Sequence, residues 1–194
     1  NRKIIGLIGL ERRKGGITML RAADAAKAAG HPWFFVLAGA LRLEEYPHEE
    51  RQFLQGHLER ARSGDPQGSV FFADPLAPIP DGPAYNAVIN RFDILFTAYH
   101  DFQGSSNVLT KSAILRKLVV STAFGCIGER TTSYDLGLTI KQGDAAACCE
   151  AIAHLLNGQA WDGQTLQPRH EEYHHLHDRG RLDKAFTELL GLVN

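Results

Sequence analysis

Short apolar segments alternate with helix-length segments along most of this chain. The first apolar segment, 4–8, is nearly continuous, which is typical of a strand buried on both faces. An alanine-rich segment at 17–29 follows it and predicts a helix. The alternation then repeats, with strands expected at 33–37, 69–73, 93–97, 118–121 and 138–140, and helices at 49–62, 85–92, 106–115 and 145–156.

Strands that are separated by helices favour right-handed crossovers and a parallel sheet covered on both faces. We therefore predict a doubly wound, Rossmann-like α/β domain with about six strands over residues 1–163. From residue 164 the pattern changes to a C-terminal tail of two polar helices, 168–178 and 182–190, divided by Gly180. The four prolines within 74–83 predict a surface loop there.

Composition narrows the classes of function. The 194 residues carry a formal net charge of -1, so the strongly basic character of many nucleic-acid-binding domains is absent, and we expect no nucleic-acid partner. The three cysteines form no disulfide or CxxC pattern, which favours a reducing, cytoplasmic location. No apolar run is long enough to span a bilayer. The chain opens on Asn1 and runs almost at once into a strand, as expected of a domain cut from a longer polypeptide.

Two segments that follow predicted strands could bind phosphate, because ligands of parallel sheets bind beyond the carboxyl ends of the strands. Segment 9–16 combines three glycines with Arg12, Arg13 and Lys14, which suits a diphosphate near a helix N-terminus. It matches neither GxGxxG nor a P-loop, and a solvated basic turn is the alternative. Segment 103–107 offers small residues and the Ser105 and Ser106 hydroxyls; simple N-capping is its alternative.

Two further segments carry weaker signals. The glycines of 124–129 permit close approach to a ligand but suit a tight turn equally well, and Cys126 has no identified basic partner. His170, Glu171 and His174 spell H-E-x-x-H, which can bind zinc on a helix. The local excess of histidine makes a chance match easy, so a solvated helix is favoured and no metal is expected.

Six of these stretches, in this order, resemble the C-terminal, donor-binding domain of the two-domain GT-B glycosyltransferases of the "glycosyl transferases group 1" family. The resemblance covers residues 4–156. It rests on Gly-x-x-x-x-Lys-Gly at 9–15, a strand ending in glycine at 35–39, a strand at 92–96, the donor-loop region 103–120, a Gly-x-x-Gly-Glu loop at 125–129, and Gly-Leu, strand, Gly-Asp, helix at 136–156.

The resemblance implies a retaining glycosyltransferase of the hexosyltransferase class, with a nucleotide diphosphate sugar as donor and no tightly bound cofactor. Lys14 and Arg13 would stabilise the leaving diphosphate, and Gln103 would contact the sugar. Further donor contacts would involve Gly9, Arg12, Gly39, Asp74, Leu76, Gly104, Ser105, Ser106, Asn107 and Lys111. A missing N-terminal domain would bind the acceptor and receive the tail, so this part alone would be inactive. The parent chain could touch a membrane peripherally.

The sequence departs from the family pattern at its paired glutamates. Gln103 and Lys111 stand in their places, and a lysine cannot accept the hydrogen bonds that the second glutamate takes from the donor ribose. Leu10 replaces an arginine that commonly follows the first strand, so Arg12 or Arg13 would supply the second cation. The alternative hypothesis is therefore a non-catalytic Rossmann-like interaction module that has lost donor binding.

Overall fold

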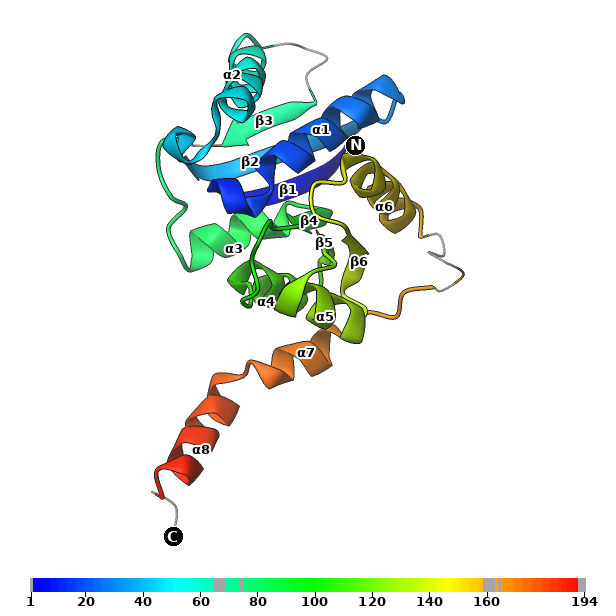
Figure 1. Cartoon of the computed structure of the whole chain (residues 1–194). Helices are drawn as coiled ribbons and strands as arrows, with labels where there is room; N and C mark the ends of the chain where they lie inside the picture. Colours follow the sequence, from blue (N-terminus) through cyan, green and yellow to red (C-terminus); the bar gives the residue numbers. More distant parts are fainter. Residues whose placement is uncertain (1, 65–68, 74, 159–162, 164, 192–194) are drawn as a thin grey trace.

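The computed structural model describes residues 2–64, 69–73, 75–158, 163 and 165–191, and these contain a six-stranded parallel sheet (Figure 1). The strand order is β3-β2-β1-β4-β5-β6. This order confirms the predicted doubly wound, Rossmann-like fold. The strands are β1 (Lys3–Leu10), β2 (Trp33–Leu41), β3 (Val70–Ala73), β4 (Ile94–Thr97), β5 (Leu118–Thr122) and β6 (Gly137–Ile140).

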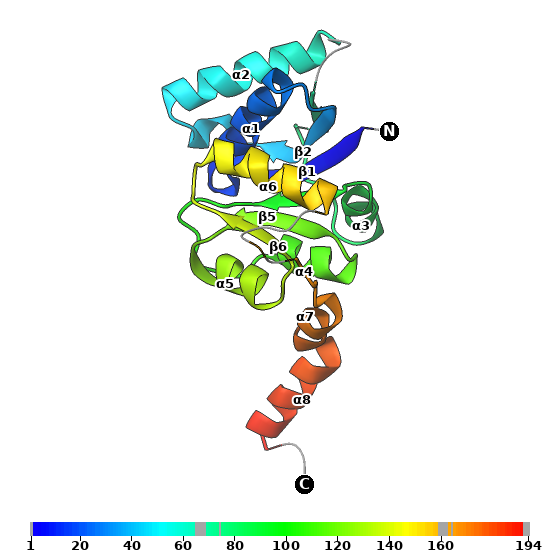
Figure 2. The ribbon, with the colours of Figure 1, turned by 90° about the vertical axis from the view of Figure 1, so that its right-hand side faces the viewer.

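Helices cover both faces of the sheet, so the protein has three layers (Figure 2). One face carries α1 (Gly16–Ala28), α2 (His48–Arg62) and α6 (Ala145–Asn157), and the other carries α3 (Pro83–Asn90), α4 (Asn107–Ile114) and α5 (Gly125–Ser133). Two short 3-10 helices, η1 (Arg12–Lys14) and η2 (Leu43–Glu45), follow β1 and β2. The central strands are buried because both faces are covered; the side chains of Ile5 and Leu7 are fully enclosed.

Two sequence-based expectations were wrong in detail. Residues 125–129 are not a loop: they open helix α5, whose Ile127 is buried and whose Gly128 lies against the backbone of Ala123. Packing thus stabilises a helix that its two glycines disfavour. Gly180 does not separate the tail helices, because it lies inside α8 (Arg179–Leu189), where its N–H donates to the Asp178 cap at 3.1 Å.

The tail joins the domain through α7 (His170–Leu176). Tyr173 of α7 is fully buried and its ring packs 5.2 Å from that of Tyr134, while the Arg169 N–H donates to the Tyr134 carbonyl. Helix α8 points away from the sheet and has no buried residue among its described positions (Figure 1). Its packing on a further domain stays a prediction. Within the described ranges, no helix is both long and apolar enough for a membrane span.

Candidate functional site

The strand order places a crevice between the carboxyl ends of β1 and β4. The chain leaves β1 towards β2 and leaves β4 towards β5, so the connections diverge, and ligands of doubly wound sheets bind at such a point. The loops that follow these strands meet there. Gly15 has a φ of 78° and a Cβ on it would lie 2.4 Å from the Ala98 carbonyl oxygen, so only glycine permits this approach. The His100 N–H donates to the Arg13 carbonyl at 2.8 Å.

A chain of side-chain contacts connects the two phosphate-binding candidates, segments 9–16 and 103–107, and it consists of Lys14, Tyr99 and Ser106. Lys14 Nζ donates to the Tyr99 hydroxyl at 3.0 Å, and that hydroxyl lies 3.2 Å from Ser106 Oγ. Ser106 also caps α4, because its Oγ accepts from the Leu109 N–H at 3.4 Å. Capping, one of the two alternatives for this segment, is observed at Ser106, and phosphate binding stays a prediction. A helix N-terminus, a lysine and a serine hydroxyl therefore converge at one position.

The Lys14 side chain is partly buried beside a second cation. Burial and, to a lesser extent, the neighbouring Arg13 lower the pKa of Lys14 to about 8, against a smaller opposite effect of Glu11. Burial likewise raises the pKa of Tyr99 to about 12, so its hydroxyl stays protonated at neutral pH. A bound anion would relieve the repulsion between the two cations.

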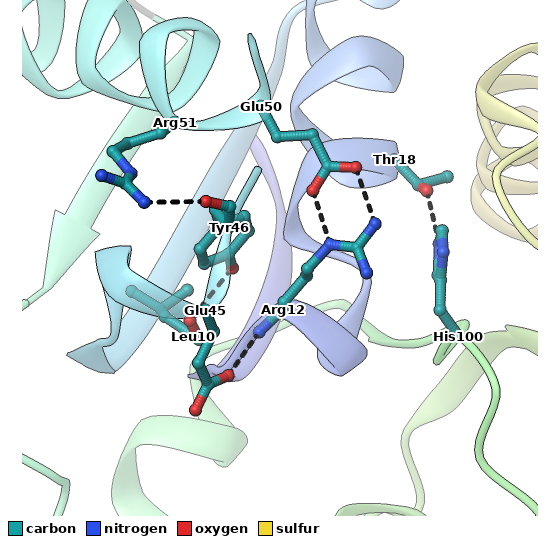
Figure 3. Close-up of polar contacts among 8 residues, drawn as sticks. All are labelled: Leu10, Arg12, Thr18, Glu45, Tyr46, Glu50, Arg51 and His100. Carbon is teal, nitrogen blue, oxygen red and sulfur yellow. Dashed lines mark hydrogen bonds and ion pairs between the residues drawn. The ribbon is translucent and has the colours of Figure 1, made fainter. Parts of the chain in front are cut away.

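Arg12 and Arg13 have different environments although they are adjacent. Arg12 donates twice to the Glu50 carboxylate of α2, at 2.8 and 3.0 Å, and its N–H donates to Glu45 (Figure 3). This pairing raises the pKa of Arg12 and lowers that of Glu50. Arg13 is exposed, lies 4.9 Å above the Phe102 ring, and has no ion pair within the described part of the chain. Arg13 is thus the better-placed second cation.

A polar cleft of about 590 Å³ opens beside this loop, on the α1 side. Arg12, Arg13, Thr18 and His100 are among its lining residues. Thr18 Oγ1 lies 2.9 Å from His100 Nε2, and this contact joins α1 to the end of β4 (Figure 3). Burial lowers the pKa of His100, which keeps its imidazole neutral at pH 7.

The donor-loop residues have mixed exposure. Gln103, Gly104, Ser105 and Asn107 are exposed above the crevice, whereas Ser106 is buried. The Gln103 carbonyl accepts from the Cys126 N–H at 3.2 Å, so the start of α5 supports the loop.

Lys111, at the position of the second glutamate in the family that the sequence resembles, is in contact with neighbours from α3 and the turn before it. Its ammonium forms an ion pair with Asp81 and stands 4.3 Å above the Tyr85 ring. The Lys111 side chain is only 15% exposed. These contacts direct its charge towards α3.

The remaining predicted donor residues lie along β1 and β2 or beyond β3. Gly39 has a φ of 106°, and a Cβ on it would lie 3.5 Å from the Gly9 nitrogen, so the two strand ends run side by side. Leu76 is 89% exposed on the loop after β3. Asp74 lies outside the described residues.

The H-E-x-x-H segment forms α7. Glu171 pairs with Arg116, and His170 Nδ1 is buried without a hydrogen-bond partner among the described residues. Across those residues no three His, Cys, Asp or Glu side chains are placed to hold a metal ion.

Three residues at the crevice were not identified from the sequence as functional. Tyr99 lies two residues beyond β4, and a polar aromatic residue directly after a buried strand could have been noticed. No sequence pattern pointed to Tyr85 or Asp81, because their contact with Lys111 depends on how α3 packs against α4.

Solved structures share this fold, although no family model and no curated protein matches the sequence. Sucrose-phosphate synthase from Thermosynechococcus elongatus is 21% identical, with a TM-score of 0.69 over 99% of this chain and 46% of that one. Anabaena HepE, solved with UDP and glucose, is 15% identical, with a TM-score of 0.72 over 98% and 48%. The C-terminal domain of a group 1 family glycosyl transferase, LpcC from Francisella tularensis, is 15% identical, with a TM-score of 0.64 over 90% and 83%.

These similarities confirm the resemblance at the level of the fold: the chain shares the fold of the C-terminal domain of LpcC and of just under half of each of the two longer chains. It spans just under half the length of the sucrose-phosphate synthase and HepE chains.

Proposed function

We propose that this chain is the donor-nucleotide-binding domain of a retaining glycosyltransferase that moves a hexose from a nucleotide diphosphate sugar to an acceptor hydroxyl. One observation carries the proposal: the hydrogen-bonded connection from Lys14 through Tyr99 to Ser106 at the crevice between β1 and β4. It brings a cation with a lowered pKa to a capped helix N-terminus, and both groups favour an anion.

The diphosphate would lie across the two loops. Lys14 and Arg13 would stabilise the negative charge that develops on the leaving diphosphate, which is where preorganised cations lower a barrier most. The α4 N-terminus and Ser106 would hold the phosphate oxygens, and the exposed Gln103 would face the transferred sugar. Arg12 would act indirectly by holding the loop against Glu50.

The acceptor would bind mainly to an N-terminal domain outside this sequence. The two longer structural relatives support this proposal, because each chain is about twice as long as the part it shares with this one. The isolated chain would then bind donor without transferring sugar. A transfer assay with UDP-glucose that gives full turnover on the isolated chain would contradict this division of labour.

A second candidate is a non-catalytic interaction module. The contacts of Lys111 with Asp81 and Tyr85 favour this candidate. In the family that the sequence resembles, a donor-binding glutamate stands at this position, whereas here the position holds a lysine that already has two partners within the domain. Binding of no nucleotide by the chain would support this candidate.

Calorimetric titration with UDP, GDP, ADP and their glucose conjugates tests the main proposal. UDP is the first probe because the HepE structure contains it. We expect one nucleoside diphosphate to bind selectively, and Lys14→Ala and Ser106→Ala to weaken it at least tenfold. Lys184→Ala, at an exposed lysine of α8, is the matched control and should bind as the wild type does. Equal affinities for all four proteins would reject the site.

A further inference from the structure

The Glu11 side chain places an unsatisfied carboxylate oxygen at the end of β1. Its Oε2 atom is buried, and no donor among the described residues reaches it. The Glu11 carbonyl accepts from the Lys14 N–H at 2.9 Å, which closes the η1 turn and fixes the residue beside Lys14. Glu11 also lines the 590 Å³ cleft, so a ligand can reach this loop.

Gly9 provides the space that this carboxylate occupies. A Cβ on Gly9 would lie 2.7 Å from Glu11 Oε2 and 3.2 Å from Lys14 Cε. The carboxylate and the lysine stem therefore lie together over a backbone without a side chain. Gly9 has a φ of 86°, which also favours glycine.

The negative charge of Glu11 affects the pKa values of Tyr99 and Tyr85. Burial is the main cause of the raised pKa of Tyr99 and of Tyr85, and the negative charge of Glu11 raises both further. Tyr99 contacts Lys14 and Ser106, and Tyr85 underlies Lys111. The carboxylate therefore lies within electrostatic range of both tyrosines.

An ionised carboxylate can only accept hydrogen bonds, and an enclosed oxygen without a donor is unfavourable. Cationic neighbours draw a diphosphate to this crevice, but the anionic diphosphate oxygens have no hydrogen to donate to the Glu11 oxygen. Hydroxyl groups of a sugar ring supply such donors next to a diphosphate.

We propose that Glu11 accepts a hydrogen bond from a hydroxyl of the bound nucleotide sugar, on either the ribose or the transferred sugar. It would replace the acceptor that Lys111 cannot provide. This inference rests on the proposed function, because it concerns the same ligand.

The test compares Glu11→Gln with Glu44→Gln by calorimetry. Glu44 is an exposed glutamate of η2, so its substitution makes the same charge change away from the carboxylate in question. The ligands are pyrophosphate and whichever of UDP, GDP and ADP binds the wild type most tightly. We expect Glu11→Gln to weaken binding of the nucleotide, or of its glucose conjugate alone, about tenfold, because a charge-assisted hydrogen bond becomes a neutral one. Pyrophosphate has no sugar hydroxyl, so its affinity should stay equal or rise when a nearby negative charge is removed.

Two more ligands identify the hydroxyl. If the ribose is bound, the same nucleotide lacking its 2′ and 3′ hydroxyls should bind wild type and Glu11→Gln equally. If the transferred sugar is bound, the loss in Glu11→Gln should appear with the glucose conjugate and not with the diphosphate alone.

Affinities for the nucleotide and for its glucose conjugate that are both the same in Glu11→Gln and Glu44→Gln would overturn the role of Glu11, and so would an equal loss for nucleotide and pyrophosphate. Either result leaves the proposed function intact as long as the wild type binds a nucleotide. A wild-type protein that binds none of the three nucleotides overturns both proposals. Melting curves of each variant confirm that the compared proteins are folded.

Discussion

Lys14 Nζ lies 3.0 Å from the Tyr99 hydroxyl oxygen and 4.3 Å from the centre of the same ring, although the two residues are 85 positions apart. Tyr99 thereby holds the ammonium with its hydroxyl oxygen and its ring face, neither of which carries a full charge. The lysine is positioned without being neutralised, so its charge remains available to an anion.

The first prediction concerns the pH dependence of nucleotide binding. The pKa of Lys14 is about 8 in the free protein, and a bound diphosphate raises it, so the protonated form binds. Affinity should be highest near pH 7 and fall above pH 8 by up to about tenfold per pH unit. Calorimetry between pH 6 and pH 9.5 measures this fall.

Lys14→Arg is the control for this titration, because arginine stays charged throughout this range. Its binding should lose the decline above pH 8. Identical pH profiles for wild type and Lys14→Arg would assign the decline to another group.

The second prediction separates Arg12 from Arg13. Arg13→Ala should weaken nucleotide binding about tenfold, since Arg13 is the unpaired cation of the loop within the described residues. Arg12→Ala should instead lower the free energy of unfolding by about 1 kcal/mol or less, because the Glu50 pair is partly exposed and screened by solvent.

A double-mutant cycle with Glu50→Ala measures the Arg12 contribution by denaturant unfolding. A larger loss of nucleotide affinity in Arg12→Ala than in Arg13→Ala would reverse the assignment.

The third prediction concerns packing at Gly137. A Cβ there would lie 1.9 Å from the Val119 carbonyl oxygen of the neighbouring strand, and this backbone atom cannot move away without breaking the β5–β6 pairing. Gly137→Ala should reduce the free energy of unfolding by more than about 3 kcal/mol.

Gly30→Ala provides the comparison. Gly30 has a φ of 76° and open space around it, so only backbone strain applies, at about 1 kcal/mol. Urea unfolding of both variants should rank them in this order, and equal losses would show that β5 and β6 separate at little cost.

The fourth prediction concerns acid stability. His57 is 3% exposed and lies 3.2 Å from Asp24; burial lowers its pKa below the ordinary 6.5, although Asp24 partly opposes this. The unfolded chain therefore takes up the proton first. The stabilisation by neutral His57 is complete above pH 6.5 and is lost as the pH falls towards the folded-state pKa, at up to about 1.4 kcal/mol per pH unit.

His57→Gln should lose less stability than the wild type does between pH 7.5 and pH 5. His48→Gln, at an exposed histidine of α2, should follow the wild type. Parallel stability curves for all three proteins would show that His57 does not contribute to the acid response.

Much of the fold follows from local pattern. Short, mainly apolar runs predicted each of the six strands, because strands buried on both faces are rich in apolar residues. The helix 125–133 escaped prediction because Gly125, Gly128 and two threonines have low helix propensity, and burial of Ile127 against the sheet outweighs it. Local propensity indicates a helix boundary only where tertiary packing agrees with it.

The sequence by itself determined the β/α alternation, the basic loop after β1 and the small polar residues before α4. Only the tertiary structure decided that the Tyr99 hydroxyl links Lys14 to Ser106. It also decided that Arg12 forms an ion pair with Glu50 and that Lys111 forms one with Asp81. The physical reason is that strand order and helix packing bring these side chains together across long separations in the chain. Residue type predicts which charges are present, and the fold decides which of them are neutralised.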